Sequence, residues 1–111
     1  MSTLSTHVLD TSTGRPAAGL SLRLEAREGQ GWKELGRGQT NADGRLKDLA
    51  PGPLPPGVYR LTFDTAGYFR AQGKQGFYPE VTVMFDIAAA NEHYHVPLLL
   101  SPYGFSTYRG S

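Results

Sequence analysis

The last nineteen residues of this 111-residue chain collect many of the side chains that could do chemistry. Residues 93–111 read HYHVPLLLSPYGFSTYRGS and hold two of the three histidines, three of the six tyrosines and Arg109. Imidazole exchanges protons near neutral pH because its reference pKa is about 6.5. We therefore take residues 93–111 as the main candidate site.

The remaining histidine, His7, raises the alternative of a metal site. On spacing alone, His7, His93 and His95 are compatible with a three-histidine zinc site, and His93 and His95 share one face of a strand. Such sites need three converging imidazoles and often a carboxylate, however, and histidine pairs two residues apart are common by chance. The chain has no nucleophile elbow, and the GRGQ stretch that starts at Gly36 is not a phosphate-binding loop.

Without a motif, each candidate side chain has an ordinary structural role. A histidine in a strand is most often a surface or packing residue, which is the expectation for His93. By the same reasoning Arg45 is a solvated residue after a turn, Tyr108 is a packing aromatic, and Arg109 is a charge that protects an edge strand. The residues alone therefore predict a histidine-bearing outward face and do not assign a reaction.

The composition is that of an ordinary globular chain. Hydrophobic residues make up 39% and charged residues 19%, and the length is typical of one domain spanning residues 1–111. The net charge of +1 and the mixing of signs argue against nucleic-acid binding. The absence of cysteine excludes disulfides and thiolate metal sites. We expect a cytoplasmic protein that binds no membrane, because no run approaches the ~18 apolar residues of a span and the N-terminus lacks a signal-peptide pattern.

Turn signals and alternation predict an all-β protein with one short helix. Fourteen glycines and eight prolines are scattered along the chain, and the Asp43-Gly44 pair is a strong turn signal. A helix is expected over residues 65–73, with Thr65 as its cap and Gly73 at its end. Seven or eight short strands with turns every eight to twelve residues are typical of a β-sandwich. The expected strands are residues 4–10, 19–26, 32–39, 45–46, 58–64, 80–87, 93–100 and 105–109.

Alternation along the strands separates core faces from outward faces. In the first strand, His7 lies opposite the face that carries Leu4, Thr6 and Val8. In residues 93–100 the even-numbered residues form the better core face, so His95 lies outward with Pro97 and Leu99. This outward face is unusually apolar for a solvated surface, which indicates an interface. In the third strand, Trp32 and Leu35 are the expected packing residues.

The last expected strand has no following partner in the sequence. At a sheet edge it must be covered or paired, because an open edge invites association with another strand. Pairing with a second copy of itself would make a self-complementary two-fold contact.

Three segments of the chain resemble the 5-hydroxyisourate hydrolases, a family of transthyretin-related proteins. They are LSTHVLDTSTGRPA at residues 4–17, GRL at residues 44–46, and HYHVPLLLSPYGFSTYRGS at residues 93–111. The ending YRGS, residues 108–111, is similar to the signature of that family, which transthyretin itself lacks. The resemblance implies a transthyretin-like (prealbumin-like) β-sandwich of two four-stranded sheets with one short helix. It also implies a homotetramer, a dimer of dimers in which edge strands pair and the active sites lie in a channel shared between subunits.

The same resemblance implies the site residues and the reaction. His7, Arg45, His95 and Ser111 are the expected catalytic residues, and His7, Arg45 and Tyr108 are expected to bind the substrate. The implied reaction opens the ring of purine-derived 5-hydroxyisourate to 2-oxo-4-hydroxy-4-carboxy-5-ureidoimidazoline, on the way from urate to allantoin. Either His7 or His95 is suited to be the general base, and no metal ion or organic cofactor is required.

Two other functions stay open at this point. One is a non-enzymatic transthyretin-like carrier of a small aromatic ligand, which the polar histidine and arginine set disfavours because apolar ligands prefer aliphatic lining. The other is an interaction module, since residues 13–68 also resemble prealbumin-like accessory domains of extracellular proteins. The complete set of histidines ranks that second alternative low.

Overall fold

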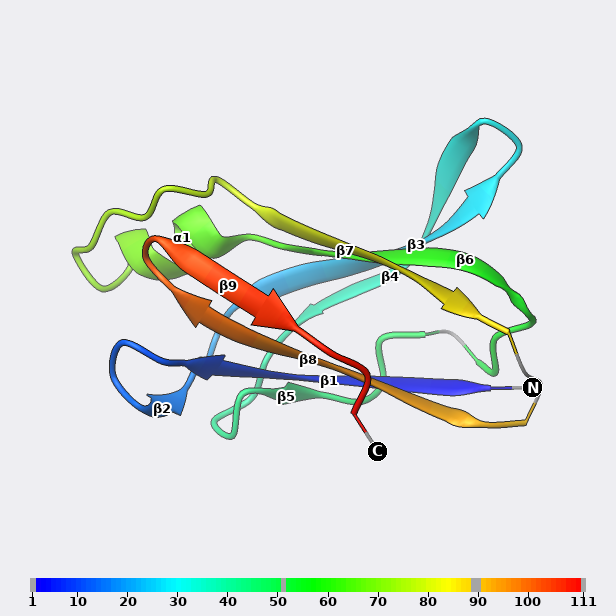
Figure 1. Cartoon of the computed structure of the whole chain (residues 1–111), viewed down its shortest axis with the longest axis horizontal. Coiled ribbons are helices and arrows are strands. Elements are labelled where there is room, and N and C mark those ends of the chain that lie inside the picture. Colours follow the sequence, from blue (N-terminus) through cyan, green and yellow to red (C-terminus); the bar gives the residue numbers. More distant parts are fainter. Residues whose placement is uncertain (1, 51, 89–90, 111) are drawn as a thin grey trace.

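A computed structural model describes residues 2–50, 52–88 and 91–110 of the chain. Two β-sheets pack face to face, and one short helix lies at one end of them (Figure 1). The helix is α1 (Thr65–Arg70). The strands are β1 (Thr3–Asp10), β2 (Arg15–Pro16), β3 (Ser21–Glu28), β4 (Gly31–Gln39), β5 (Arg45–Leu46), β6 (Gly57–Phe63), β7 (Val81–Ile87), β8 (His93–Ser101) and β9 (Gly104–Thr107). This arrangement confirms the predicted β-sandwich with one short helix.

The first sheet, which carries the candidate residues, has the strand order β2-β1-β8-β9, and β5 also pairs with β1. Strand β2 pairs with Leu9 and Asp10, whereas β5 pairs with Thr6 and His7, so the two short strands share one edge of β1. The sheet is therefore four strands wide, as predicted, with one position filled by two pieces. Strand β8 runs parallel to β1 along its other edge, over the whole length of β1.

Side chains in β1 and β8 alternate as the sequence predicts. Leu4, Thr6 and Val8 are buried, whereas His7 is half-buried on the outer face. In β8 the even-numbered side chains from 94 to 100 are buried, and His95 is half-buried on the outer face. Pro97 is buried although it lies on the same side as His95. The predicted outward face is therefore present. Of its apolar side chains, Pro97 is buried and Leu99 is half-buried by other residues of the same chain.

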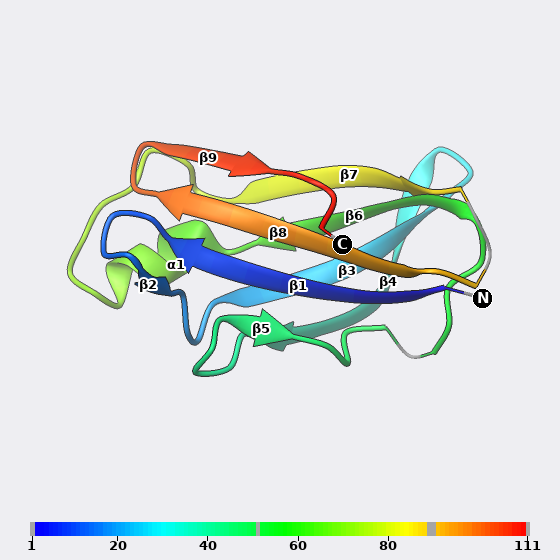
Figure 2. The same cartoon turned by 60° about the horizontal axis from the view of Figure 1, so that its bottom comes forward.

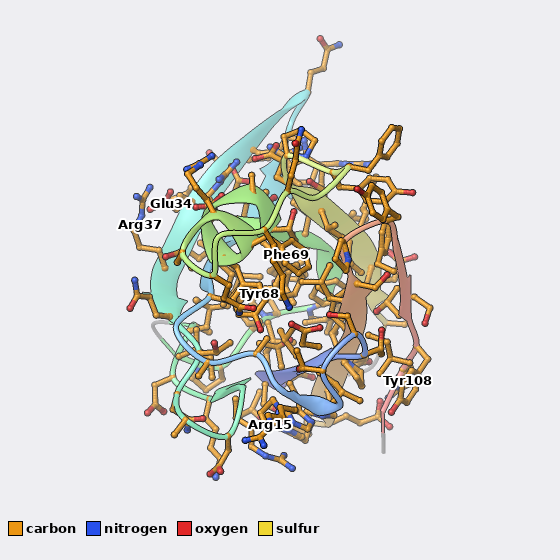
Figure 3. The ribbon with its side chains drawn as sticks, turned by 90° about the vertical axis from the view of Figure 1, so that its left-hand side faces the viewer. Arg15, Glu34, Arg37, Tyr68, Phe69 and Tyr108 are labelled. Atoms are coloured by element: carbon orange, nitrogen blue, oxygen red, sulfur yellow. The ribbon has the colours of Figure 1, made fainter. Side chains whose placement is uncertain are left out.

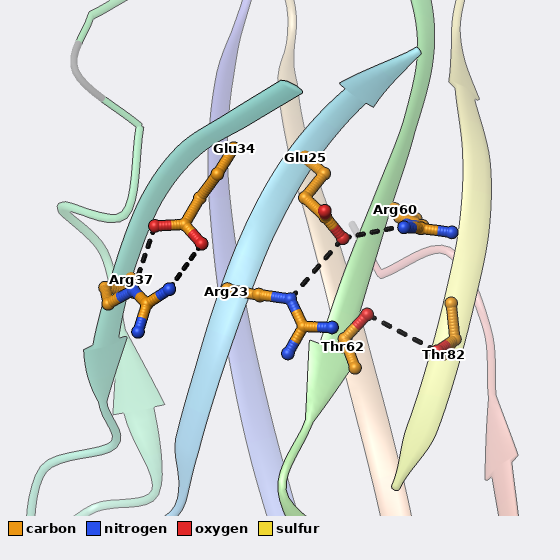
Figure 4. A network of polar contacts seen from close by, with 7 residues as sticks. All are labelled: Arg23, Glu25, Glu34, Arg37, Arg60, Thr62 and Thr82. Atoms are coloured by element: carbon orange, nitrogen blue, oxygen red, sulfur yellow. Dashed lines mark hydrogen bonds and ion pairs between the residues drawn. The ribbon is translucent and has the colours of Figure 1, made fainter. Parts of the chain in front are cut away.

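The second sheet, in the order β4-β3-β6-β7, presents a polar outer face (Figure 4). Glu25 accepts a hydrogen bond from Arg60 Nε at 2.8 Å and lies 3.5 Å from Arg23 Nε. Arg60 also stacks on Trp32, with 4.2 Å between the guanidinium carbon and the ring centroid. Trp32 therefore packs, as predicted, but against an arginine rather than in the core cluster. Leu35 packs against the core.

Buried apolar side chains from both sheets and from α1 form one core cluster. Tyr68 and Phe69 of the helix lie between the sheets (Figure 3). Tyr68 Oη donates to Asp10 Oδ2 at 2.8 Å, and the side chain of Ser12 donates to the other carboxylate oxygen at 2.5 Å. Burial alone would raise the pKa of Asp10, but these hydrogen bonds hold it below its ordinary value. The buried carboxylate thereby ties the helix to the end of β1.

The start and the end of α1 differ from the prediction. Asp64, not Thr65, caps the helix, because its Oδ1 accepts a hydrogen bond from the N–H of Gly67 at 3.0 Å. Thr65 is buried and donates to the carbonyl of Tyr78 at 2.8 Å. The helix ends at Arg70, before the predicted end. No helix among the described residues is long and apolar enough to cross a membrane.

Candidate active site

His7, Arg45 and His95 are brought onto one face of the first sheet by three neighbouring strands, β1, β5 and β8 (Figure 2). His7 in β1 is directly opposite Arg45 in β5. On the other edge of β1, Ser5 is opposite His95 and His7 is opposite Pro97, so His7 and His95 are diagonal neighbours. Arg45 is exposed, and both histidines are half-buried. Residues from both ends of the chain therefore meet on this face.

A tight turn holds Arg45 against β1. Asn41 Oδ1 accepts hydrogen bonds from the backbone N–H groups of Asp43 at 2.9 Å and Arg45 at 3.0 Å. Gly44 has a φ of +73°, and its carbonyl accepts from the N–H of Val8 at 2.8 Å. A Cβ at residue 44 would lie 2.5 Å from the Val8 carbonyl oxygen, so the turn requires glycine there. The predicted turn is confirmed, and Asn41 is a positioning residue that the Asp-Gly signal did not reveal.

His95 is held in its neutral form by its surroundings. Burial lowers the pKa of His95 below its ordinary value, and the positive charges of Arg45, His7 and His93 lower it further. A hydrogen bond with the backbone of Ser5 opposes the shift of the pKa. His95 Nδ1 lies 2.8 Å from Ser5 Oγ, so Nε2 is the nitrogen available to a water molecule or ligand. Neutral imidazole is the form that accepts a proton.

His93 is joined to His95 through Ser5. Ser5 Oγ lies 2.9 Å from His93 Nε2, and Thr3 Oγ1 lies 2.6 Å from His93 Nδ1. Four side chains thus form one continuous chain of hydrogen bonds, in the order Thr3, His93, Ser5 and His95. His93 is exposed, as expected, but its contacts depend on the parallel register of β1 and β8, which no local pattern encodes. Within the described part of the chain, no group of three His, Cys, Asp or Glu side chains is arranged to hold a metal ion.

The terminal segment packs on His95 after a break in strand pairing. Pro97 has no N–H to donate, and its carbonyl accepts from Thr107 Oγ1 at 2.7 Å. Strand β9 ends at Thr107, before the predicted end at residue 109, and pairing resumes at Gly110, whose N–H donates to the His95 carbonyl at 2.8 Å. A Cβ at residue 110 would lie 2.5 Å from His95 Cδ2. Glycine is therefore needed at residue 110 for the His95 ring to keep its place.

Tyr108 and Arg109 lie between the end of β9 at Thr107 and the pairing of Gly110 with His95. Arg109 stacks on the ring of Tyr94, with 4.5 Å between the guanidinium carbon and the ring centroid, and lies 3.4 Å from Glu92 Oε2. Tyr108 is 58% exposed at the molecular surface (Figure 3). Arg109 thus anchors the segment and leaves Tyr108 accessible to a ligand or a second subunit. Ser111, which was predicted to be catalytic, lies outside the described residues.

A cavity of about 300 Å³ lies beside the terminal segment. It is lined by residues 83–86, 94–96 and 107–109, so it includes His95 and Tyr108 but neither His7 nor Arg45. A larger cavity of about 430 Å³ lies on the second sheet, around Arg23 and Arg37, and contains none of the candidate residues. The three residues His7, Arg45 and His95 together therefore lie on an open sheet face, and of the three only His95 also lines one of these two cavities.

The fold and the site define a transthyretin-like β-sandwich with histidine and arginine side chains on the outer face of one sheet. The HIUase/Transthyretin family model matches residues 4–110, and the chain belongs to this family.

Individual proteins of the family are similar over nearly the whole chain. The chain is 51% identical over 109 residues to the 5-hydroxyisourate hydrolase of Salmonella dublin, covering 97% of this chain and 80% of that protein. The structure of Klebsiella pneumoniae 5-hydroxyisourate hydrolase is similar with a TM-score of 0.89 and 44% identity, covering 100% of both chains. The crystal structure of transthyretin from Sparus aurata is similar with a TM-score of 0.90 and 34% identity, covering 96% of this chain and 95% of that one. These similarities confirm the resemblance and the fold class predicted from the sequence.

Proposed function

We propose that this chain is an enzyme that opens the ring of 5-hydroxyisourate to 2-oxo-4-hydroxy-4-carboxy-5-ureidoimidazoline, in the degradation of urate to allantoin. The observation that carries the proposal is the meeting of His7, Arg45 and His95 on one sheet face. The chain's 51% identity to a 5-hydroxyisourate hydrolase supports the same substrate. Hydrolysis of a cyclic amide C–N bond needs an activated water, a stabilised oxyanion and a proton for the departing nitrogen.

His95 is the proposed general base. Its lowered pKa keeps the imidazole neutral at pH 7, and its Nε2 accepts a proton from water as the water oxygen bonds to the carbonyl carbon. The imidazolium that forms then gives a proton to the ring nitrogen as the C–N bond breaks. One water is consumed and neutral His95 is regenerated, so the reaction requires no metal ion or organic cofactor.

Arg45 and His7 bind the reacting group in this proposal. The guanidinium of Arg45 donates hydrogen bonds to the carbonyl oxygen that gains negative charge, and the turn at residue 44 fixes where the arginine leaves the backbone. His7, directly opposite Arg45, orients the water or the substrate. Tyr108 positions the substrate ring, and Ser111 aligns the water or the substrate.

We also propose that the site is completed in a homotetramer. Strands β7 and β9 each lie at the edge of their sheet, along the same side of the sandwich (Figure 1). Pairing of these edges with a second copy makes a dimer, and two dimers packed through the first sheet enclose His7, Arg45 and His95 in a channel. A mass near four times the 12.1 kDa of one chain is expected by size exclusion with light scattering. A monomeric mass under assay conditions contradicts the tetramer.

The proposed compartment is the cytoplasm, where the absence of cysteine suits reducing conditions. Fractionation of cells that produce the protein tests this location.

The direct test of the function follows the decay of 5-hydroxyisourate absorbance while urate oxidase supplies the substrate. The unmodified chain is expected to accelerate the decay. His95→Asn and Arg45→Glu are expected to stay folded and lose ring opening, whereas Ser21→Ala on the second sheet keeps it. Full activity in either site variant would remove that residue from the proposed mechanism.

The carrier alternative predicts ligand binding without turnover. Sequence identity disfavours it, because the chain is 51% identical to the Salmonella dublin hydrolase and 34% identical to the Sparus aurata transthyretin. The accessory-domain alternative rested on residues 13–68, whereas the family match extends over residues 4–110.

A further inference from the structure

We propose that Ser5 and His93 form a proton relay for His95, in which His93 holds the proton that His95 takes from water. The inference rests on the proposed hydrolase function and assigns a role to a histidine which that mechanism leaves unused. Its basis is the chain of hydrogen bonds from Thr3 through His93 and Ser5 to His95, with distances of 2.6, 2.9 and 2.8 Å. In this relay His93 and Ser5 are positioning residues, since they act through His95.

The single proton of the Ser5 hydroxyl decides which form His95 adopts. Ser5 Oγ donates to only one of the two imidazoles at a time. When it donates to His93 Nε2, the Nδ1–H of His95 donates to Ser5 and its Nε2 carries a lone pair. His93 then keeps its own proton on Nδ1 and donates it to Thr3 Oγ1. This direction of the hydrogen bonds holds His95 in the tautomer that a general base needs.

The relay itself moves one proton in two coupled steps. After Nε2 of His95 has accepted a proton from water, the His95 Nδ1–H bond breaks as a new bond forms from that proton to Ser5 Oγ. The original Ser5 O–H bond breaks as its proton bonds to His93 Nε2. The net change is the transfer of one proton from His95 to His93, with no change in oxidation state. The reverse transfer returns the proton for the departing ring nitrogen.

The charges around His95 drive the proton away from it. His95 is half-buried, with Arg45 facing it from β5 and His7 facing it from β1. Around the cavity on its other side lie Asp86 of β7, Tyr108 and Arg109. A second positive charge beside Arg45 is unfavourable in a half-buried position.

The surroundings of His93 are better suited to a cation. His93 is exposed at the start of β8, and the carboxylate of the preceding residue, Glu92, is engaged by Arg109 and Tyr94. Beyond Thr3, the charged groups are Lys47 and Asp48, which line a shared cavity with Thr3 and have opposite signs. Water can solvate a positive charge at the exposed His93 ring, whereas burial and the charge of Arg45 disfavour a positive charge on His95.

The first test of the hydrogen-bond chain is ¹⁵N NMR, which measures the chemical shifts of the ring nitrogens of the three histidines. Ser5→Ala is expected to change the Nδ1 and Nε2 chemical shifts of both His93 and His95. Ser5→Thr keeps the hydroxyl and is expected to keep the shifts. His7 serves as the internal reference, and Ser21→Ala removes a strand serine on the other sheet as the matched control. Unchanged shifts of His93 and His95 in Ser5→Ala would overturn the proposal.

Kinetics then test the relay. Ser5→Ala and His93→Gln are expected to lower kcat by about tenfold or more, with KM changed by less than about twofold, because proton transfer rather than binding is impaired. His93→Gln retains a hydrogen-bonding group near Ser5 but cannot hold a proton. In mixtures of H₂O and D₂O, the rate of the unmodified enzyme should depend non-linearly on deuterium content, and that of His93→Gln linearly.

The outcomes separate the two proposals. Unchanged kcat in His93→Gln overturns the relay, even where Ser5→Ala fails to fold. Inactivity of the unmodified chain overturns the proposed hydrolase function and the relay with it, while the NMR shifts still decide whether the hydrogen-bond chain exists.

Discussion

At the scale of single residues, the charge next to His95 decides when that side chain can accept a proton. Its pKa lies below the ordinary value of 6.5 because of burial and the cations around it. At pH values between the folded and the unfolded pKa of His95, this side chain binds more protons in the unfolded chain than in the folded chain. The contribution of His95 to stability is therefore present above pH 6.5 and is lost as the pH falls through the folded pKa.

We expect Arg45→Gln to raise the pKa of His95 toward its ordinary value, because the variant removes the permanent positive charge of Arg45, which lowers that pKa. NMR titration of the ring measures this shift independently of activity. In the unmodified enzyme, kcat/KM should fall with decreasing pH along a limb that lies below pH 6.5. Arg37→Gln, on the second sheet, is the control and should leave His95 unchanged. An unmoved His95 pKa in Arg45→Gln would show that Arg45 does not act on it.

We expect Gly110→Ala to lower activity by about tenfold to a hundredfold, because displacing a catalytic group by about 1 Å costs on that order. The added Cβ would lie 2.5 Å from His95 Cδ2 and 3.3 Å from its Cβ, so the ring itself must turn. Gly52→Ala is the matched control, since nothing lies within 4 Å of a Cβ at that residue. The hydroxyisourate decay assay measures both variants, and equal activities would contradict a role for Gly110 in holding His95.

At the scale of elements, a buried carboxylate joins α1 to β1. We expect Tyr68→Phe to lower the free energy of unfolding by about 1–3 kcal/mol, because Asp10 loses one of its hydrogen bonds while buried. The folded pKa of Asp10 lies below its ordinary value, so its stabilising contribution is lost as the pH falls through the folded pKa. Because Tyr68→Phe removes a hydrogen bond that lowers the folded pKa of Asp10, the loss should be smaller in the variant and should be complete at a higher pH.

Urea unfolding at several pH values measures both effects of the Tyr68 change. Tyr103→Phe is the control, because Tyr103 is 75% exposed and the change removes the same hydroxyl group. Equal stabilities of the two variants at pH 7 would show that the bond to Asp10 contributes nothing measurable.

The elements also show what the sequence can predict. Alternation within β1 and β8 placed His7 and His95 on the outward face, because a strand carries that information in its own residues. The helix cap was predicted one residue late, because Asp64 and Thr65 are both good caps and only packing sends Thr65 to the Tyr78 carbonyl. The register between strands that are far apart in the chain cannot be predicted from the residues of either strand alone.

For that reason the contacts of the site were less predictable than its residues. The bridge through Ser5 needs Ser5 to face His95, which follows from a parallel pairing across about ninety residues of chain. The early end of β9 follows from Pro97 on the neighbouring strand, whose missing N–H is visible only once the two strands are paired. The residue types alone singled out the terminal segment, whereas the family resemblance supplied the roles of Arg45, Tyr108 and Ser111, which composition and periodicity did not assign.

At the scale of the whole molecule, residues 108–111 have a proposed role in function rather than in the fold. We expect their deletion to abolish ring opening while the sandwich stays folded, because β9 ends at Thr107 and its pairing with β8 does not require them. Circular dichroism and thermal melting check the fold, and the decay assay checks the activity. An active truncated chain would mean that the terminal residues are only structural.

The two sheets differ in how far apart along the chain their partners lie. In the second sheet every pairing is antiparallel: β3 pairs with β4 and β6 with β7, and the longer-range pairing of β3 with β6 joins residues such as Leu22 and Phe63. In the first sheet, β1 and β8 pair residues that lie still further apart in the chain, such as Thr3 and His93. Long-range pairing is slow because the loop must close before its contacts form. We expect the fluorescence of Trp32, the single tryptophan and a residue of β4, to recover before activity during refolding. Simultaneous recovery in stopped-flow experiments would contradict this order.

The same parallel pairing has a consequence during synthesis on the ribosome. Strand β1 leaves the tunnel first, but one of its edges has no partner until β8 follows more than eighty residues later. At ~5–20 residues per second, that edge stays open for roughly 5 to 20 seconds. During this interval a nascent chain presents a strand edge that other chains can pair with, which makes the N-terminal strand a target for chaperones. Newly made protein is therefore most prone to aggregate before its two site histidines have met.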